Sequence, residues 1–143
     1  MKHRKYRVMA FKLANLELFP PDDVASLLSV GVATADDLLR QAAIGDQRGA
    51  LVRLSGVTPE TLVRLVRMAD LMRIPGINEA HTQLLDALGA GSIVDLGRQT
   101  APTLIKAMRR KNVELTLVRS VPPESTVARW IAEARSLPIV LEA

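Results

Sequence analysis

Apolar side chains recur along most of this chain at intervals of three and four residues, the spacing that gathers them on one face of an α-helix. The clearest stripe lies between Thr58 and Arg73 and comprises Leu62, Leu65, Val66, Ala69, Leu71 and Met72. Thr58 suits the position before the first helical residue, and Pro59 suits the first one. Because Pro75-Gly76 ends the stripe, this stretch predicts a helix with a marked start and a marked end.

The same signals predict further helices over residues 24–30, 35–43, 93–99, 101–111 and 125–136, and one that begins near Asn78 and reaches about Leu88. No segment combines a period of two with a hairpin turn, so we expect no β-sheet. The short apolar run 138–141 fits a helix and a strand equally well. The sequence therefore predicts an all-α fold of about eight short helices.

Two sets of matches within the chain predict an internal repeat. A shift of 58 residues places Leu27, Gly31, Asp37, Leu38, Arg40 and Gln41 on Leu85, Gly89, Asp95, Leu96, Arg98 and Gln99. A shift of 65 residues places Ser55, Leu62, Leu65, Val66 and Ala69 on Ser120, Val127, Trp130, Ile131 and Ala134. Because short isolated helices are marginally stable, we expect the two copies to pack by pseudo-twofold symmetry around one continuous core.

This repeat divides the chain into four parts. Residues 1–12 form a basic N-terminal tail, and residues 13–73 form the first unit. Residues 74–137 form the second unit, and residues 138–143 form a C-terminal tail.

Two stretches twenty residues apart share the order apolar, x, Gly, apolar between predicted helices: Leu54-Ser55-Gly56-Val57 and Ile74-Pro75-Gly76-Ile77. Each resembles a helix-hairpin-helix motif, in which glycine permits the tight turn. The resemblance implies that amides at the turn and at the start of the second helix bind a DNA phosphate. The amides concerned are those of Gly76, Ile77 and Asn78, and in a second set those of Gly56, Val57 and Thr58. Glu60 and Glu79 follow these turns, where each carboxylate stabilises a helix start and repels phosphate.

Over most of its length the chain also resembles a bacterial family, domain of unknown function 4332. The resemblance lies in the order LLxxGVxTxxDLLRQ, SGVTPExLxRLVRMADLMRIPGI and VPxExxVARWIxEA, and it covers about Leu16 to Leu137. It implies tandem helix-hairpin-helix units related in fold to the N-terminal DNA-binding domains of recombinases and repair polymerases. It implies no particular activity.

Composition narrows the possible functions. Aromatic residues make up only 3% of the chain, which leaves few platforms on which single-stranded bases could stack. The formal net charge of +4 permits a polyanionic partner. The segment from Arg98 to Arg119 holds six basic residues and one acidic residue, Glu114. Such a run is either a binding surface or an ordinary solvated helix face.

No candidate active site or metal site stands out. Only two histidines occur, His3 in the basic tail and His81 inside a predicted helix, and neither has a partner at ligand spacing. Paired aspartates at 22–23 and 36–37 fall at helix starts, where the helix dipole explains them. Trp130 continues an apolar stripe, so we expect it in the core. We therefore expect no enzyme, no cofactor and no metal.

Two functional hypotheses remain. The first is a sequence-nonspecific DNA-binding module that combines the hairpin amides with Arg73, Lys106, Arg109, Arg110 and Lys111. The second is a protein-interaction or scaffold module that presents an apolar groove. No apolar run is long enough to span a membrane and no signal peptide pattern is present, so we expect a cytoplasmic protein without a membrane partner. Nothing in the sequence implies a small-molecule substrate.

Overall fold

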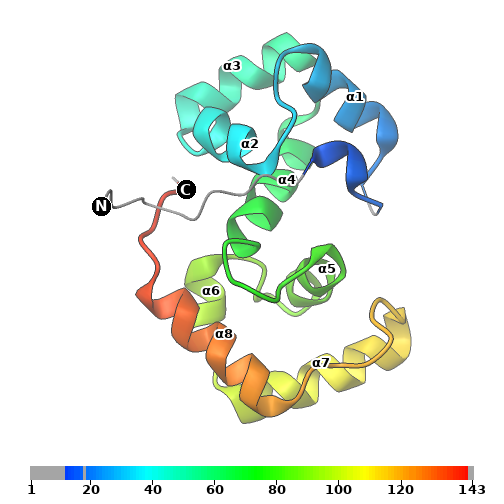
Figure 1. Ribbon diagram of the computed structural model, residues 1–143, viewed down its shortest axis with the longest axis vertical. Helices are drawn as coiled ribbons and strands as arrows, with labels where there is room; N and C mark the ends of the chain where they lie inside the picture. Colours follow the sequence, from blue (N-terminus) through cyan, green and yellow to red (C-terminus); the bar gives the residue numbers. More distant parts are fainter. Residues whose placement is uncertain (1–11, 18, 142–143) are drawn as a thin grey trace.

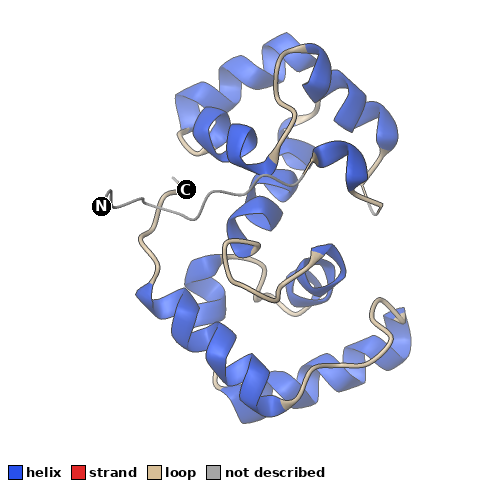
Figure 2. Cartoon of the chain, viewed as in Figure 1, coloured by secondary structure: helices blue, strands red, loops and turns tan. Residues whose placement is uncertain are grey.

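The computed structural model describes residues 12–17 and 19–141. This part of the chain contains a short 3-10 helix, eight α-helices and no strand, as Figure 2 shows, which confirms the all-α prediction. The elements are η1 (Leu13–Asn15), α1 (Pro21–Ser29), α2 (Ala35–Ala42), α3 (Gly45–Ser55), α4 (Pro59–Leu71), α5 (Glu79–Ala87), α6 (Ile93–Gly97), α7 (Ala101–Leu115) and α8 (Glu124–Ser136). The predicted basic tail, apart from Lys12, lies outside the described residues.

Side-chain caps explain why four of the helices begin where they do. Thr34, Thr58, Asn78 and Ser92 each precede a helix, and each side chain accepts a hydrogen bond from the amide three residues later. Such a bond satisfies one of the amides that a helix start leaves without a partner. These are the starts that the sequence predicts most clearly.

Two helices differ from the prediction. The helix α3 was not predicted as a separate element, because Ile44 provides no side-chain cap and two glycines interrupt its apolar spacing. The helix α7 continues one turn beyond Lys111. It ends at Thr116, which adopts the left-handed conformation at φ 48°. The Asn112 side chain closes this end by donating to the Val118 carbonyl and accepting from the Val118 amide.

The buried apolar side chains form two clusters, so the expectation of one continuous core was wrong. The first cluster extends from Leu13 to Ala69 and the second from Leu71 to Ala134, and the partly buried Met72 packs against both. In Figure 1, α4 runs from the group formed by α1, α2 and α3 toward the group formed by α5 to α8. The first group of helices therefore packs along most of α4, from Leu62 to Ala69, and the second group packs at its last residue, Leu71.

Polar contacts and the C-terminal segment, residues 137–141, connect the two groups. The Glu17 amide donates to Oε1 of Glu79 at 2.8 Å, and Arg67 on α4 lies 3.5 Å from a carboxylate oxygen of Asp86 on α5. The C-terminal segment follows α8, yet its Leu141 packs against the first cluster. Within the described ranges, no helix is long and apolar enough to cross a membrane.

Candidate nucleic-acid interface

The helix α7 presents most of its basic residues on one exposed face. Leu104, Ile105 and Met108 are buried, and α7 packs against α8 and α5. Because an α-helix has 3.6 residues per turn, Lys106 and Arg110 lie on the side away from these apolar residues. Arg109 lies on the flank next to Ile105, and all three cations are exposed. Three of the predicted DNA-binding cations therefore share one solvent-facing surface, which we call the α7 face.

The charge on the α7 face is not neutralised by nearby carboxylates. No ion pair involves Lys106, Arg109 or Arg110 in the described part of the chain, and the first turn of α7 contains no acidic residue. The fourth predicted cation, Lys111, is less exposed, and its Nζ lies 3.7 Å from Glu114. A shallow hollow of about 300 Å³ lies between Lys106 and Arg110. An anionic surface can therefore approach three long cationic side chains without displacing an internal partner.

The turn at Gly76 differs from the phosphate site expected of it. Gly76 has a φ of 95°, as a tight interhelical turn requires, but the Ile77 amide donates to the Ile74 carbonyl at 3.2 Å. The Asn78 amide donates to Nδ1 of His81 at 3.2 Å. Two of the three predicted phosphate-binding amides are thus already engaged inside the chain.

Helix α8 also lies against this turn. Arg129 donates to the Pro75 carbonyl at 3.1 Å. A methyl group added to Gly76 would lie 3.2 Å from the Arg129 guanidinium and 3.4 Å from the Trp130 indole nitrogen. Trp130 is only 1% exposed, which confirms its predicted place in the core. At the predicted phosphate site of Gly76, Ile77 and Asn78, two amides are therefore occupied within the chain, and α8 lies against the turn.

Arg73 is not part of any exposed surface. Its side chain is buried, Nη1 donates to Oδ1 of Asp70 at 2.7 Å, and Nη2 donates to the Pro138 carbonyl at 2.9 Å. Burial raises the pKa of the Asp70 carboxyl, and the hydrogen bond and charge of Arg73 oppose that rise. Arg73 therefore fixes the C-terminal segment to α4, and its guanidinium does not lie on the surface with the other predicted DNA-binding cations.

The turn at Gly56 is open but its amides are largely occupied. Gly56 has a φ of 78°, and a methyl group there would meet no atom within 4 Å. The Gly56 amide donates to the Val52 carbonyl at 2.9 Å, and the Val57 amide donates to Oγ of Ser55 at 3.1 Å. The Thr58 hydroxyl accepts the Thr61 amide as a helix cap. This second predicted cradle therefore leaves little for a phosphate to bind.

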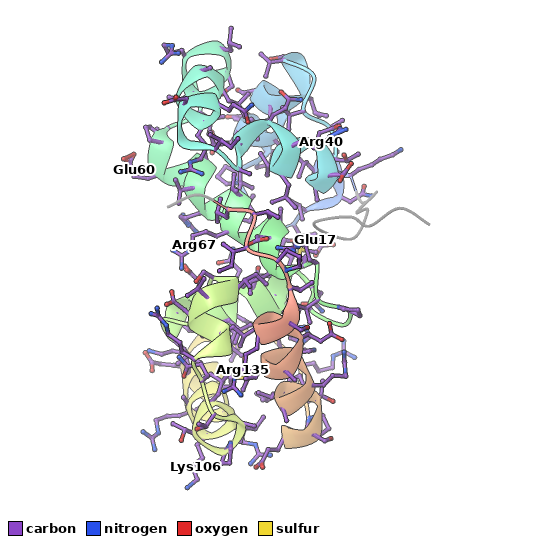
Figure 3. The ribbon with its side chains drawn as sticks, turned by 90° about the vertical axis from the view of Figure 1, so that its left-hand side faces the viewer. Glu17, Arg40, Glu60, Arg67, Lys106 and Arg135 are labelled. Carbon is purple, nitrogen blue, oxygen red and sulfur yellow. The ribbon has the colours of Figure 1, made fainter. Side chains whose placement is uncertain are left out.

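The predicted site residues do not converge. Figure 3 shows Glu60, which lies just after the Gly56 turn, in the α1–α4 half of the molecule and Lys106 at the far end of the other half. The Gly76 turn lies between α4 and α5, against α8. Only the α7 face unites several of the predicted residues.

One of two further glycine turns already binds a carboxylate of the chain itself. Gly31 follows α1 and Gly89 follows α5, both with positive φ. After Gly31, the amides of Ala33 and Thr34 both donate to Oδ2 of Asp37, and hydrogen bonds from these backbone amides contribute to lowering the pKa of that carboxyl. An internal carboxylate thus takes the place that a phosphate would need. The 58-residue match in the sequence marks both turns, but it does not reveal this internal acceptor.

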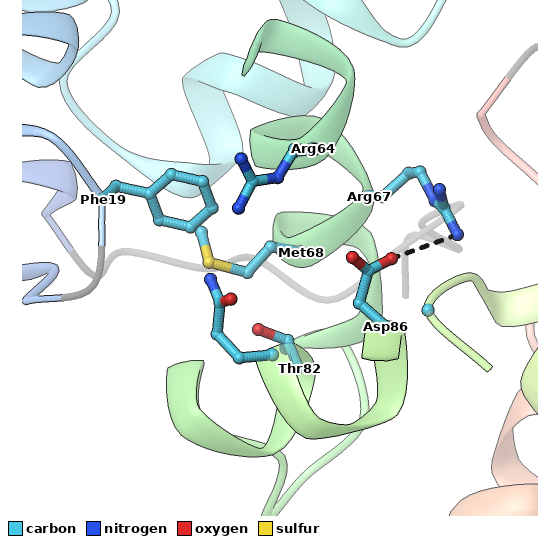
Figure 4. Close-up of a pocket in the computed structure, with 8 residues that line it drawn as sticks. Phe19, Arg64, Arg67, Met68, Thr82 and Asp86 are labelled. Carbon is cyan, nitrogen blue, oxygen red and sulfur yellow. Dashed lines mark ion pairs between the residues drawn. The ribbon is translucent and has the colours of Figure 1, made fainter. Parts of the chain in front are cut away.

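A small hollow between α4 and α5 offers no room for a ligand. Figure 4 shows Arg64 beside the Phe19 ring and Arg67 turned toward Asp86. The Arg64 guanidinium lies 5.8 Å from the centre of the Phe19 ring. The hollow has a volume of about 20 Å³, which is the space of one water molecule. No group of three potential metal ligands occurs among the residues placed by the structure.

The comparison with known proteins gives one match. A family model described as "Domain of unknown function (DUF4332)" matches residues 19–137. No curated protein and no solved structure matches the chain.

Proposed function

We propose that this chain, which belongs to the DUF4332 family, is a non-enzymatic module that binds DNA without reading its sequence. The observation that carries the proposal is the α7 face, where Lys106, Arg109 and Arg110 are exposed together without an internal ion pair. Contacts between such cations and phosphates position a protein on DNA and carry no sequence information directly.

The duplex backbone is the better match for this surface. Single strands are held mainly by bases stacked on aromatic side chains. Phe19 and Trp130, the aromatic residues of the described part other than His81, are 5% and 1% exposed. Lys106 and Arg110 lie one helical turn apart, so both side chains can reach along one rim of a groove. The α7 face therefore supports phosphate contacts to double-stranded DNA.

We infer further that the glycine turns belong to the helix-hairpin-helix class and that the chain contains a 58-residue repeat. In support, the Val32 amide bonds to the Leu27 carbonyl just as the Ala90 amide bonds to the Leu85 carbonyl. Thr34 and Ser92 then cap the next helices in the same way. In this proposal the turns fix the angles between helices, and α7 takes over the contact with phosphate.

Binding to a short duplex at about 50 and 200 mM salt tests the proposed function. The test variant changes Lys106, Arg109 and Arg110 together to Gln. The control variant changes Arg40, Arg53 and Arg64, which are exposed on other helices, to Gln as well. Both variants lose the same charge. We expect binding that weakens steeply with salt. The slope of log binding constant against log salt concentration should become shallower by up to about 3 in the test variant alone.

Two results would count against the proposal. Equal loss in the two variants would assign the binding to net charge and not to the α7 face. No binding at either salt concentration would remove DNA as the ligand and favour a protein partner.

A further inference from the structure

A second candidate surface lies far from the α7 face, where α4, α6 and the C-terminal segment meet. These elements enclose an open groove of about 450 Å³, which falls within the range of small-molecule sites. Its apolar lining consists of Val63, Val66, Ile93, Val94, Ile139 and Leu141.

Three of these side chains are exposed although they are apolar. Val63 and Val94 are each 39% exposed, and Ile139 is 71% exposed. Single exposed apolar residues are ordinary, but these come from three segments distant in the sequence and line one groove. Together they give the groove an apolar wall that a hydrocarbon chain can contact.

Most polar groups that line the groove already have partners within the chain. Asp70 is paired with Arg73, and the Ser92 hydroxyl donates to Oδ2 of Asp95 at 2.9 Å. A peptide backbone laid into the groove would find few partners for its amides and carbonyls, which carries a desolvation cost. A hydrocarbon chain has no polar groups and needs no hydrogen-bond partners.

Besides Arg48, whose Nη1 donates to the carbonyls of Ala42 and Ala43 at 3.0 Å, the groove is lined by the cation of Arg67. Its guanidinium lies 3.5 Å from Asp86, and the two side chains are 33% and 47% exposed. An ion pair this loose and this exposed is weak. Because guanidinium has five donors, Arg67 can bind a second carboxylate while it stays near Asp86.

We propose that this groove binds a small aliphatic carboxylate, with its hydrocarbon chain against Val63, Val94 and Ile139 and its carboxylate on Arg67. The inference is independent of DNA binding, because it uses other helices and another ligand chemistry. It assigns to the chain a ligand class that the sequence does not imply.

Three eight-carbon probes of different charge test the inference: octanoate, octanol and octylammonium, each kept below its micelle-forming concentration. Amide chemical shifts of the full chain are followed during each titration. We expect saturable shifts around Val63, Val94 and Ile139, with octanoate binding up to about fivefold tighter than octylammonium, since an exposed ion pair contributes up to about 1 kcal/mol.

Two variants separate the roles of charge and apolar surface. Arg67→Gln is expected to weaken the binding of octanoate about fivefold and to leave the affinity for octanol unchanged. Arg64→Gln, on the same helix but outside the groove, is the matched control and is expected to change neither. Val94→Ser is expected to weaken the binding of all three probes.

The inference is overturned if octanoate causes no saturable shifts, or if the shifts lie elsewhere on the molecule. Equal affinity for the three probes also overturns it, because the groove would then be an apolar surface without selection for an anion. Loss of DNA binding in the α7 variant bears on none of these results.

Discussion

His81 is partly buried and has a capping role at the start of α5. Its Nδ1 accepts the Asn78 amide, while the Asn78 side chain accepts the His81 amide at 2.9 Å. Its ring lies 4.9 Å from the Trp130 ring, centre to centre. Burial lowers the pKa of His81 and a hydrogen bond with the Gly76 backbone opposes the shift, so the neutral ring belongs to the folded state.

This arrangement predicts acid sensitivity. Because the folded pKa lies below the ordinary value of 6.5, the unfolded chain binds a proton first as the pH falls. The stability linked to His81 is therefore complete above pH 6.5 and is lost below it, down to the folded pKa. Urea unfolding at several pH values measures the effect.

His81→Gln is the matched variant, since glutamine keeps an acceptor at the capping position and does not titrate. We expect it to reduce the loss of stability below pH 6.5, while any contribution of His3 stays the same in both proteins. An unchanged pH profile would show that His81 does not couple protonation to folding.

Single residues also show what sequence reasoning can and cannot reach. Trp130 is predicted to be buried because it continues a helical stripe, and the structure confirms it. Arg73 follows a similar stripe, but its partners are Asp70 and the carbonyl of Pro138, 65 residues away. No local pattern predicts a contact over that separation, so its burial was missed.

Glycine stabilises the folded chain in a left-handed turn and destabilises it inside a helix. Gly56 ends α3 with a φ of 78°, a conformation that side chains with a Cβ adopt only under strain. Gly49 lies inside the same helix, where glycine only adds flexibility to the unfolded chain. A methyl group at Gly49 would make an ordinary contact of 3.6 Å with Arg53.

The two glycines therefore predict opposite effects of the same substitution. Gly56→Ala is expected to lower the free energy of unfolding by about 1 to 2 kcal/mol. Gly49→Ala is expected to raise it by about 0.8 to 1 kcal/mol. Urea denaturation of both variants checks the pair, and a loss of stability in both would mean that α3 does not have the described boundaries.

Helix boundaries are predictable where a residue marks them. Thr34, Thr58, Asn78 and Ser92 identify four helix starts through cap bonds that the structure confirms. The end of α7 carries no glycine, because Thr116 takes the left-handed conformation and Asn112 secures it through Val118. Its extra turn could not be predicted from local signals.

The whole molecule depends on contacts that join its two apolar clusters. Arg73 lies at the end of α4, between them, and its hydrogen bond to Pro138 holds the C-terminal segment against α4. Leu141 at the end of that segment packs on the first cluster although α8 belongs to the second. The buried pair of Arg73 with Asp70 therefore holds a connection between the halves.

Removing one member of this pair should lower the free energy of unfolding more than removing both. Arg73→Met leaves the Asp70 carboxylate buried without its partner and is expected to cost about 3 to 5 kcal/mol. Asp70→Leu combined with Arg73→Met removes both charges and is expected to recover most of that loss. Urea unfolding of the single and double variants decides this, and equal losses would show that Asp70 needs no partner.

The α7 face could be predicted from the sequence, and the groove could not. Helical spacing places Lys106, Arg109 and Arg110 together because all three belong to one helix. The groove depends on Val63, Val94 and Ile139, which meet only after the chain folds. The closure of the turns by Asp37, Ser55 and His81 also depends on side-chain positions that spacing does not fix.

Mapping amide chemical shifts while a short DNA duplex is added at low salt tests the central claim most directly. The α7 face predicts that the largest changes lie between Pro102 and Val113. Changes centred on the Gly56 or Gly76 turns, with α7 unaffected, would contradict it.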